Sequence, residues 1–129
     1  SRGISAEKSE EYVELGTPGT PDIDSKIIVR SFVLTTFESI KPILDSLREG
    51  YTIALVNIHP LKERDLVELK RAINKLKKTT DAIEGDIAGF GENWIAAVPN
   101  FAYIYRGQKG TTEETPKPEE MQEVSEYQE

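Results

Sequence analysis

The chain has 129 residues and a formal net charge of −7, a length that fits one domain with tails. It contains no cysteine, which excludes a disulfide framework and thiolate chemistry. No stretch approaches the roughly 18 apolar residues of a membrane span, and no signal peptide is recognisable.

The negative charge is concentrated at the two ends of the chain. Residues 26–106 carry 12 basic and 10 acidic side chains, whereas residues 1–25 and 107–129 are both strongly acidic. Acidic ends keep a protein soluble, and a nearly neutral centre is compatible with self-association. We therefore expect a flexible arm over 1–25, a folded domain over 26–106 and a disordered acidic tail over 107–129. Within the arm, the apolar patch at residues 11–15 could dock on the domain or on a partner.

Residues 26–34 (KIIVRSFVL) are rich in β-branched and aromatic residues, which predicts a strand that is apolar on both faces. A helix follows. Thr35 and Glu38 fit a capping box, apolar residues then recur at helical spacing from Ile40 to Leu47, and Gly50 ends the helix.

Residues 51–58 (YTIALVNI) predict a second strand that is apolar on both faces. A longer helix follows, beginning at Leu61 or Asp65 and ending near Lys78, and Asp65 with Glu68 forms its cap signal. Its expected buried stripe consists of Leu66, Leu69, Ile73 and Leu76.

Three further strands are expected at residues 85–90, 94–98 and 101–105, with a tight turn at 91–93. The order is strand, helix, strand, helix, strand, strand, strand. The expected fold class is α/β (an α+β sandwich) with a mixed four- to five-stranded sheet and two helices.

Two helices are too few to cover such a sheet. Strands lie about 4.8 Å apart and packed helices about 10 Å apart, so two helices cover one face at most. If the two crossovers run in opposite directions across the sheet, each face is half covered instead. In both cases apolar sheet remains exposed, and we expect a symmetric dimer or a higher assembly to bury it.

Signs of catalytic chemistry are weak. His59 is the sole histidine and stands at a strand end, where a turn residue is expected rather than a catalyst or ligand. Asp65, Asp81, Glu84 and Asp86 are explained by capping and solvation. The glycines at 85, 89 and 91 match no phosphate-binding loop. We expect neither an enzyme nor a bound metal or cofactor.

Two binding functions remain open from the residues alone. The element order is similar to the Alba family of archaeal chromatin proteins, and the second helix is lysine-rich. However, nucleic-acid binding needs a basic surface, and the domain is close to neutral, so we expect no nucleic-acid partner. The other alternative is a regulatory domain that binds a small ligand on its sheet face.

Five segments together resemble SepF, a cell-division family. They are KIIVRSFVLTTFESI, LREGYTIALVNI, DLVELKRAINKL, AIEGDIAGFG and NWIAAVPNFAYI. The steps Gly85-Asp86-Ile87 and Val98-Pro99-Asn100 are the most specific, and the patch at residues 11–15 is similar to archaeal members. The resemblance implies an adaptor that dimerises or polymerises and binds the C-terminal peptide of the tubulin-like protein FtsZ. It also implies an amphipathic membrane helix, which we expect to precede Ser1, and a cytoplasmic location at the inner face of the membrane at the division site.

The resemblance also implies site residues. Gly85 matches a glycine important for self-assembly, and Ile95 matches an aromatic position tied to FtsZ binding in bacterial members. The expected self-association residues are Gly85, Ile87, Phe32 and Ala97. The expected FtsZ-peptide residues are Lys70, Arg71, Ile73, Phe90, Trp94 and Ile95. Because an FtsZ tail is disordered, we expect an apolar groove flanked by Lys and Arg to capture it.

Overall fold

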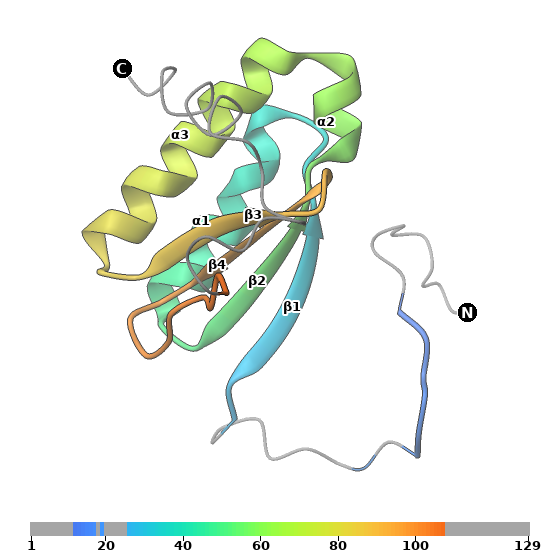
Figure 1. Cartoon of the computed structure of the whole chain (residues 1–129), viewed down its shortest axis with the longest axis vertical. Coiled ribbons are helices and arrows are strands. Elements are labelled where there is room, and N and C mark those ends of the chain that lie inside the picture. The colour runs from blue at the N-terminus through green and yellow to red at the C-terminus, as the bar shows by residue number, and fades with distance from the viewer. Residues whose placement is uncertain (1–11, 18, 20–25, 108–129) are drawn as a thin grey trace.

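The computed structural model describes residues 12–17, 19 and 26–107 (Figure 1). In chain order its elements are β1 (Ile28–Val33), the 3-10 helix η3 (Phe37–Ser39), α1 (Ile40–Glu49), β2 (Thr52–Asn57), α2 (His59–Arg64), α3 (Leu66–Ala82), β3 (Asp86–Phe90) and β4 (Trp94–Val98). The α+β class with a mixed sheet is confirmed. Most of the expected arm and all but Gly107 of the expected tail lie outside the described residues.

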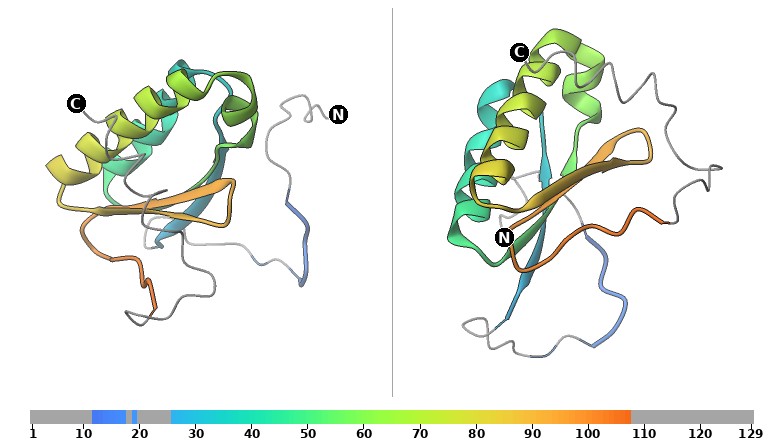
Figure 2. Two further views of the ribbon diagram at one scale, coloured as in Figure 1. Left: turned by 45° about the horizontal axis from the view of Figure 1, so that its top comes forward. Right: turned by 60° about the vertical axis from the view of Figure 1, so that its left-hand side comes forward.

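The strand order places both main helices on one face of the sheet. The order is β1-β2-β4-β3, with β1 parallel to β2, and β4 antiparallel to both β2 and β3. Both crossovers, β1 to β2 and β2 to β3, therefore advance in the same direction across the sheet. Since such crossovers are right-handed, α1 and α3 fall on the same side, as Figure 2 shows. The opposite side has no helix among the described residues.

The start of α1 differs from the expected capping box. The hydroxyl of Ser39, not the carboxylate of Glu38, accepts hydrogen bonds from the backbone N–H groups of Thr35 at 3.2 Å and Thr36 at 3.1 Å. A turn of 3-10 helix precedes α1 as a result, and the cap lies one residue later than predicted. Gly50 ends α1 in the left-handed region, at φ 101°, as expected for a C-terminal glycine.

The second helical region is two helices rather than one. Asp65 is extended at φ −158° and ψ 95°, so it separates α2 from α3, and its carboxylate accepts from the backbone N–H of Glu68 at 3.0 Å. Asp65 is thus the expected N-cap. The expected buried stripe is correct for Leu69, Ile73 and Leu76 but wrong for Leu66, which is 49% exposed.

The expected strand at 101–105 is not formed. This stretch runs as an irregular segment along the sheet (Figure 2). It is attached through the side chain of Asp86, which accepts from the backbone N–H of Ile104 at 2.8 Å and from both terminal nitrogens of Arg106. The side chain of Asp86 therefore joins this segment to β3, where backbone hydrogen bonds between strands were expected.

Gly85 is required by the close approach of its backbone to β4. A Cβ built at this position would lie 2.0 Å from the carbonyl oxygen of Val98, and its backbone N–H donates to the carbonyl of Thr80 at 2.7 Å. The other glycine of this hairpin differs, since a Cβ on Gly89 would meet its nearest atom at 3.7 Å. The chain can enter β3 beside β4 only without a side chain at 85.

Candidate functional site

An apolar groove lies on the helical side, between the start of α1 and the middle of α3. Its cavity is about 300 Å³ and is lined by Phe37, Glu38, Ile40, Lys41, Leu44 and Lys75. The floor consists of phenyl and branched aliphatic carbons, and charged side chains stand on its rim. Pockets that combine apolar walls with a few polar groups are typical ligand sites.

A network of polar contacts fixes the geometry of this groove. The carboxylate of Glu68 on α3 accepts a hydrogen bond from the backbone N–H of Phe37 at 2.6 Å. The guanidinium of Arg64 joins the same carboxylate at 3.2 Å and donates to the carbonyl of Thr35 at 3.0 Å. These contacts hold η3 against α3, and so they hold the phenyl ring of Phe37 at the mouth of the groove.

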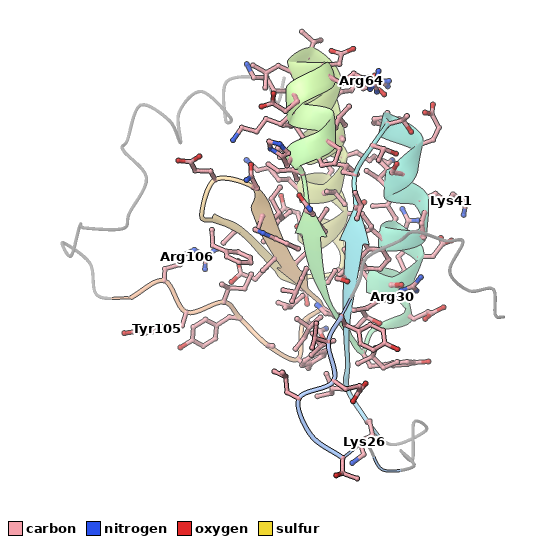
Figure 3. The ribbon with its side chains drawn as sticks, turned by 90° about the vertical axis from the view of Figure 1, so that its right-hand side faces the viewer. Lys26, Arg30, Lys41, Arg64, Tyr105 and Arg106 are labelled. Atoms are coloured by element: carbon pink, nitrogen blue, oxygen red, sulfur yellow. The ribbon has the colours of Figure 1, made fainter. Side chains whose placement is uncertain are left out.

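The rim of the groove is mostly basic. The guanidinium of Arg71 lies 3.9 Å from the centre of the Phe37 ring, a cation–π contact. Lys75 follows Arg71 one helical turn later and lines the groove itself. Lys41, on α1 (Figure 3), also lines the groove and is paired at 2.9 Å with the exposed Asp45. Lys41 and Lys75 therefore line the apolar floor together with the acidic Glu38, and Arg71 lies beside them on the ring of Phe37.

The second surface is the sheet face opposite the helices. Strand register places one set of apolar side chains on this face: Val29, Val33, Ile53, Leu55, Ala88, Phe90, Trp94 and Ala96. Most are half-buried in the single chain, but Val29 on the edge strand is 63% exposed and Phe90 is 47% exposed. Neighbouring apolar side chains that stay exposed in a single chain are typical of interaction surfaces.

The β3–β4 hairpin adds an aromatic pair to this face. The rings of Phe90 and Trp94 stack with centroids 6.2 Å apart and planes inclined by 21°. Gly91, at φ 59°, makes the turn between them, as the sequence predicts. Rigid aromatic side chains are frequent at interface centres.

The predicted FtsZ-peptide residues are divided between the two faces. Lys70, Arg71 and Ile73 lie on α3, where Arg71 reaches the groove and Ile73 is buried in the core. Phe90 and Trp94 lie on the opposite sheet face, while Ile95 points under the helices and is 5% exposed. No single surface in the described chain contains all six.

The predicted self-association residues lie on the covered side. Phe32, Ile87 and Ala97 are packed in or against the core beneath the helices, and Gly85 precedes β3 at its close contact with β4. The side chains of Phe32, Ile87 and Ala97 are therefore not part of the open sheet face.

Sequence reasoning missed most residues of both surfaces. Phe37, Ile40, Lys41, Leu44 and Lys75 belong to helices whose relative position depends on strand order. The only sequence signal was the apolar spacing within the first helix. Of the residues on the open sheet face, only Phe90 and Trp94 were predicted as site residues, because each strand is apolar on both of its faces and the sequence does not show which face the helices cover.

The remaining polar residues do not form a second chemical site. The ring of His59 pairs with the side chain of Asn93 at 3.2 Å. Arg106 and the backbone N–H of Ile104 lower the pKa of Asp86 to about 2, against partial desolvation. Within the described ranges, no three potential metal ligands cluster, and no helix is both long and apolar enough to cross a bilayer.

Comparison with known proteins identifies the fold. A "SepF-like protein from Archaeoglobus fulgidus" superposes with a TM-score of 0.59 at 22% identity, covering 66% of this chain and 100% of its own. A "SepF-like protein from Pyrococcus furiosus" gives a TM-score of 0.56 at 24% identity, covering 70% and 100%. No curated protein matches the chain. These comparisons do not support the similarity to Alba.

The sequence profile of the family described as "Cell division protein SepF" matches residues 29–104. This range runs from β1 through the helices α1, α2 and α3 and the β3–β4 hairpin to the segment held by Asp86. The match extends over more than half of the chain and agrees with the sequence resemblance, so the chain belongs to the SepF family of cell division proteins.

Proposed function

We propose that this protein is an adaptor of the division ring, which self-associates and tethers FtsZ filaments by binding their C-terminal peptide. The observation that supports this most is the separation of two surfaces. The uncovered apolar sheet face and the basic-rimmed groove lie on opposite sides of one sheet. Pairing through the first therefore leaves the second free, as an adaptor requires.

Self-association would use the uncovered sheet face. Burying a few hundred Å² of apolar surface contributes several kcal/mol at about 25 cal/mol per Å², while association itself costs at least about 4 kcal/mol. A face that is already half-buried in the single chain gives a modest surplus. The dimer is therefore expected to be reversible, with its population set by protein concentration.

The groove would take the FtsZ peptide. Apolar side chains of a disordered tail would enter between Phe37 and Leu44, and carboxylates of the tail would meet Lys41, Arg71 and Lys75. Each contact is expected to be weak, in the micromolar range. A dimer presents two grooves to a filament with many tails, and the resulting avidity makes weak single contacts sufficient. Membrane attachment would come from an amphipathic helix, which would hold the protein at the inner membrane face.

Self-association is tested by Val29→Lys on the edge of the open face. We expect the wild-type chain to sediment as a dimer at high concentration and the variant as a monomer. Val67→Lys is the matched control, because Val67 is 77% exposed on α3. A dimer in all three proteins would exclude the open sheet face, and a wild-type monomer would exclude self-association.

Peptide binding is tested by calorimetry with the FtsZ tail peptide of the same organism. Lys75→Glu reverses a charge on the groove rim and is expected to weaken binding at least about fivefold, more at low salt. Lys26→Glu makes the same charge change at the far end of β1 (Figure 3) and is expected to leave binding unchanged. Equal loss in both variants would point to net charge alone, and no heat with wild type would refute FtsZ binding.

A further inference from the structure

We propose that the groove is also bound by residues 119–128 of the same chain, which compete there with the FtsZ peptide. The competition with the FtsZ peptide rests on the proposed function. The binding of residues 119–128 to the groove does not depend on it. It assigns a role to an acidic segment that the division-ring function does not otherwise use.

The segment has an amphipathic pattern. Met121, Val124 and Tyr127 stand three residues apart, which places them along one side of a helix. Five of the eight positions around them are glutamates, Glu119, Glu120, Glu123, Glu126 and Glu129, and the other three are Gln122, Ser125 and Gln128. Pro118 stands just before the pattern, where proline is tolerated at the first turn of a helix. An apolar stripe edged by carboxylates is the chemistry expected of an adaptor-bound acidic peptide.

The groove is complementary to such a segment in both respects. Its floor offers the phenyl ring of Phe37 and the side chains of Ile40 and Leu44 to an apolar stripe. Its rim offers Lys41, Arg71 and Lys75 to the glutamates. The core as a whole is nearly neutral, so these side chains are the cations nearest to an apolar stripe bound in the groove.

The connecting chain has a span comparable with the size of the domain. Met121 follows Gly107, the last described residue, by fourteen positions, which span up to about 46 Å when extended. A flexible connection of this length has a root-mean-square span of about 20 Å, comparable with the size of a small domain. The effective concentration of the segment at the groove is then in the millimolar range, so even a contact with a millimolar dissociation constant is substantially populated.

Such a contact would set a threshold for filament binding. One intramolecular segment lowers the apparent affinity for a single FtsZ peptide by a few-fold. A filament that presents many tails to a dimer gains avidity and displaces the segment. The adaptor would thus discriminate polymerised FtsZ from isolated subunits.

The test uses the full chain and a triple variant, Met121→Ala, Val124→Ala and Tyr127→Ala. Its control is a chain in which residues 119–129 are scrambled to keep composition and charge but lose the three-residue spacing. We expect the triple and scrambled variants to shift the backbone amide NMR signals of Phe37, Leu44 and Lys75 relative to wild type, and to bind the FtsZ peptide about two- to fivefold more tightly. These shifts should persist on dilution, since the contact lies within one chain.

The outcomes separate this inference from the proposed function. Unchanged groove signals together with equal peptide affinity would overturn the segment contact and leave FtsZ binding intact. Shifted groove signals without any peptide binding would overturn FtsZ binding and leave the contact intact. If the shifts disappear on dilution, the segment binds a second copy, and competition within one chain is refuted. If the scrambled chain behaves as wild type, charge alone carries the contact and the amphipathic fit is wrong.

Discussion

The side chain of Asp86 holds the segment that follows β4, and its removal gives a quantitative test of the fold. Its two carboxylate oxygens accept from Arg106 at 2.9 and 3.0 Å, and one also accepts from the backbone N–H of Ile104 at 2.8 Å. Bidentate charged pairs of this kind are stronger than neutral hydrogen bonds. Asp86→Asn keeps the shape of the side chain but removes its charge.

The magnitude follows from the pKa of Asp86, which falls from 3.8 to about 2. A full shift of this size corresponds to about 2.4 kcal/mol of folding free energy. The Arg106 side chain is 52% exposed, and solvent screening reduces the value to about 1 kcal/mol. Because the folded pKa lies below the unfolded one, the stabilisation is complete well above pH 4 and is lost as the pH falls towards 2.

Thermal unfolding followed by circular dichroism checks this prediction. At pH 7, Asp86→Asn is expected to lower Tm by roughly 4–8 °C, as a loss of about 1 kcal/mol does in a domain of this size. The difference from wild type should shrink by about half near pH 3. Asp45→Asn is the control, since its pair with Lys41 is largely exposed and contributes little. A Tm difference that is absent at pH 7, or that stays constant down to pH 2.5, would refute the reasoning.

Two further substitutions test the elements that position the surfaces. Gly85→Ala forces a methyl group against the carbonyl of Val98 and is expected to lower the free energy of unfolding by about 3 kcal/mol in a denaturant titration. Gly89→Ala should lower it by less than about 1 kcal/mol, and equal losses in the two variants would contradict the close-approach explanation. Asp65→Ala removes the N-cap of α3 and is expected to cost about 1 kcal/mol, with Asp65→Asn retaining most of the stability; an unaffected alanine variant would show that the cap is dispensable.

The sequence predicted the elements whose signals are local. β1, β2 and β4 follow from β-branched and apolar runs, and the cap at Asp65 follows from its spacing to Glu68. The start of a helix is harder to predict where two neighbouring residues can both act as the N-cap. Thr35 and Thr36 both permit a cap, and the choice depends on Glu68, which binds the backbone N–H of Phe37 from 31 residues away.

Two errors have the same origin. The sequence predicts one helix that begins at Leu61 or Asp65. The structure has two helices, because Pro60 lies in the first turn of α2 and Asp65 is the N-cap of α3. The stretch 101–105 has strand-like composition but no strand, since Arg106 donates to the carbonyl of Ile87 at the free side of β3. In both cases a polar contact, not apolar periodicity, decided the structure.

The candidate surfaces could not be predicted because they depend on which face of the sheet the helices cover. Phe32 and Val33 are equally apolar, and only the strand order assigns the first to the core and the second to the open face. That order in turn depends on β4 lying between β2 and β3. Among the predicted peptide residues, Arg71 reaches the groove because its guanidinium lies on the ring of Phe37, whereas Ile73 on the same helix is buried.

The arrangement of the two surfaces is a consequence of a single topological step. β3 runs parallel to β2 but is not adjacent to it. The chain turns tightly at Gly91, and β4 then lies between β2 and β3. Because both crossovers advance in one direction, α1 and α3 lie side by side and create the groove between them, while the other face carries no helix in the described part of the chain. A substitution that displaces β3 from β4, such as one at Gly85, would therefore alter this face first. The groove, fixed by Glu68 between η3 and α3, would change less, so loss of self-association with retained peptide binding is the signature expected of damage to the hairpin.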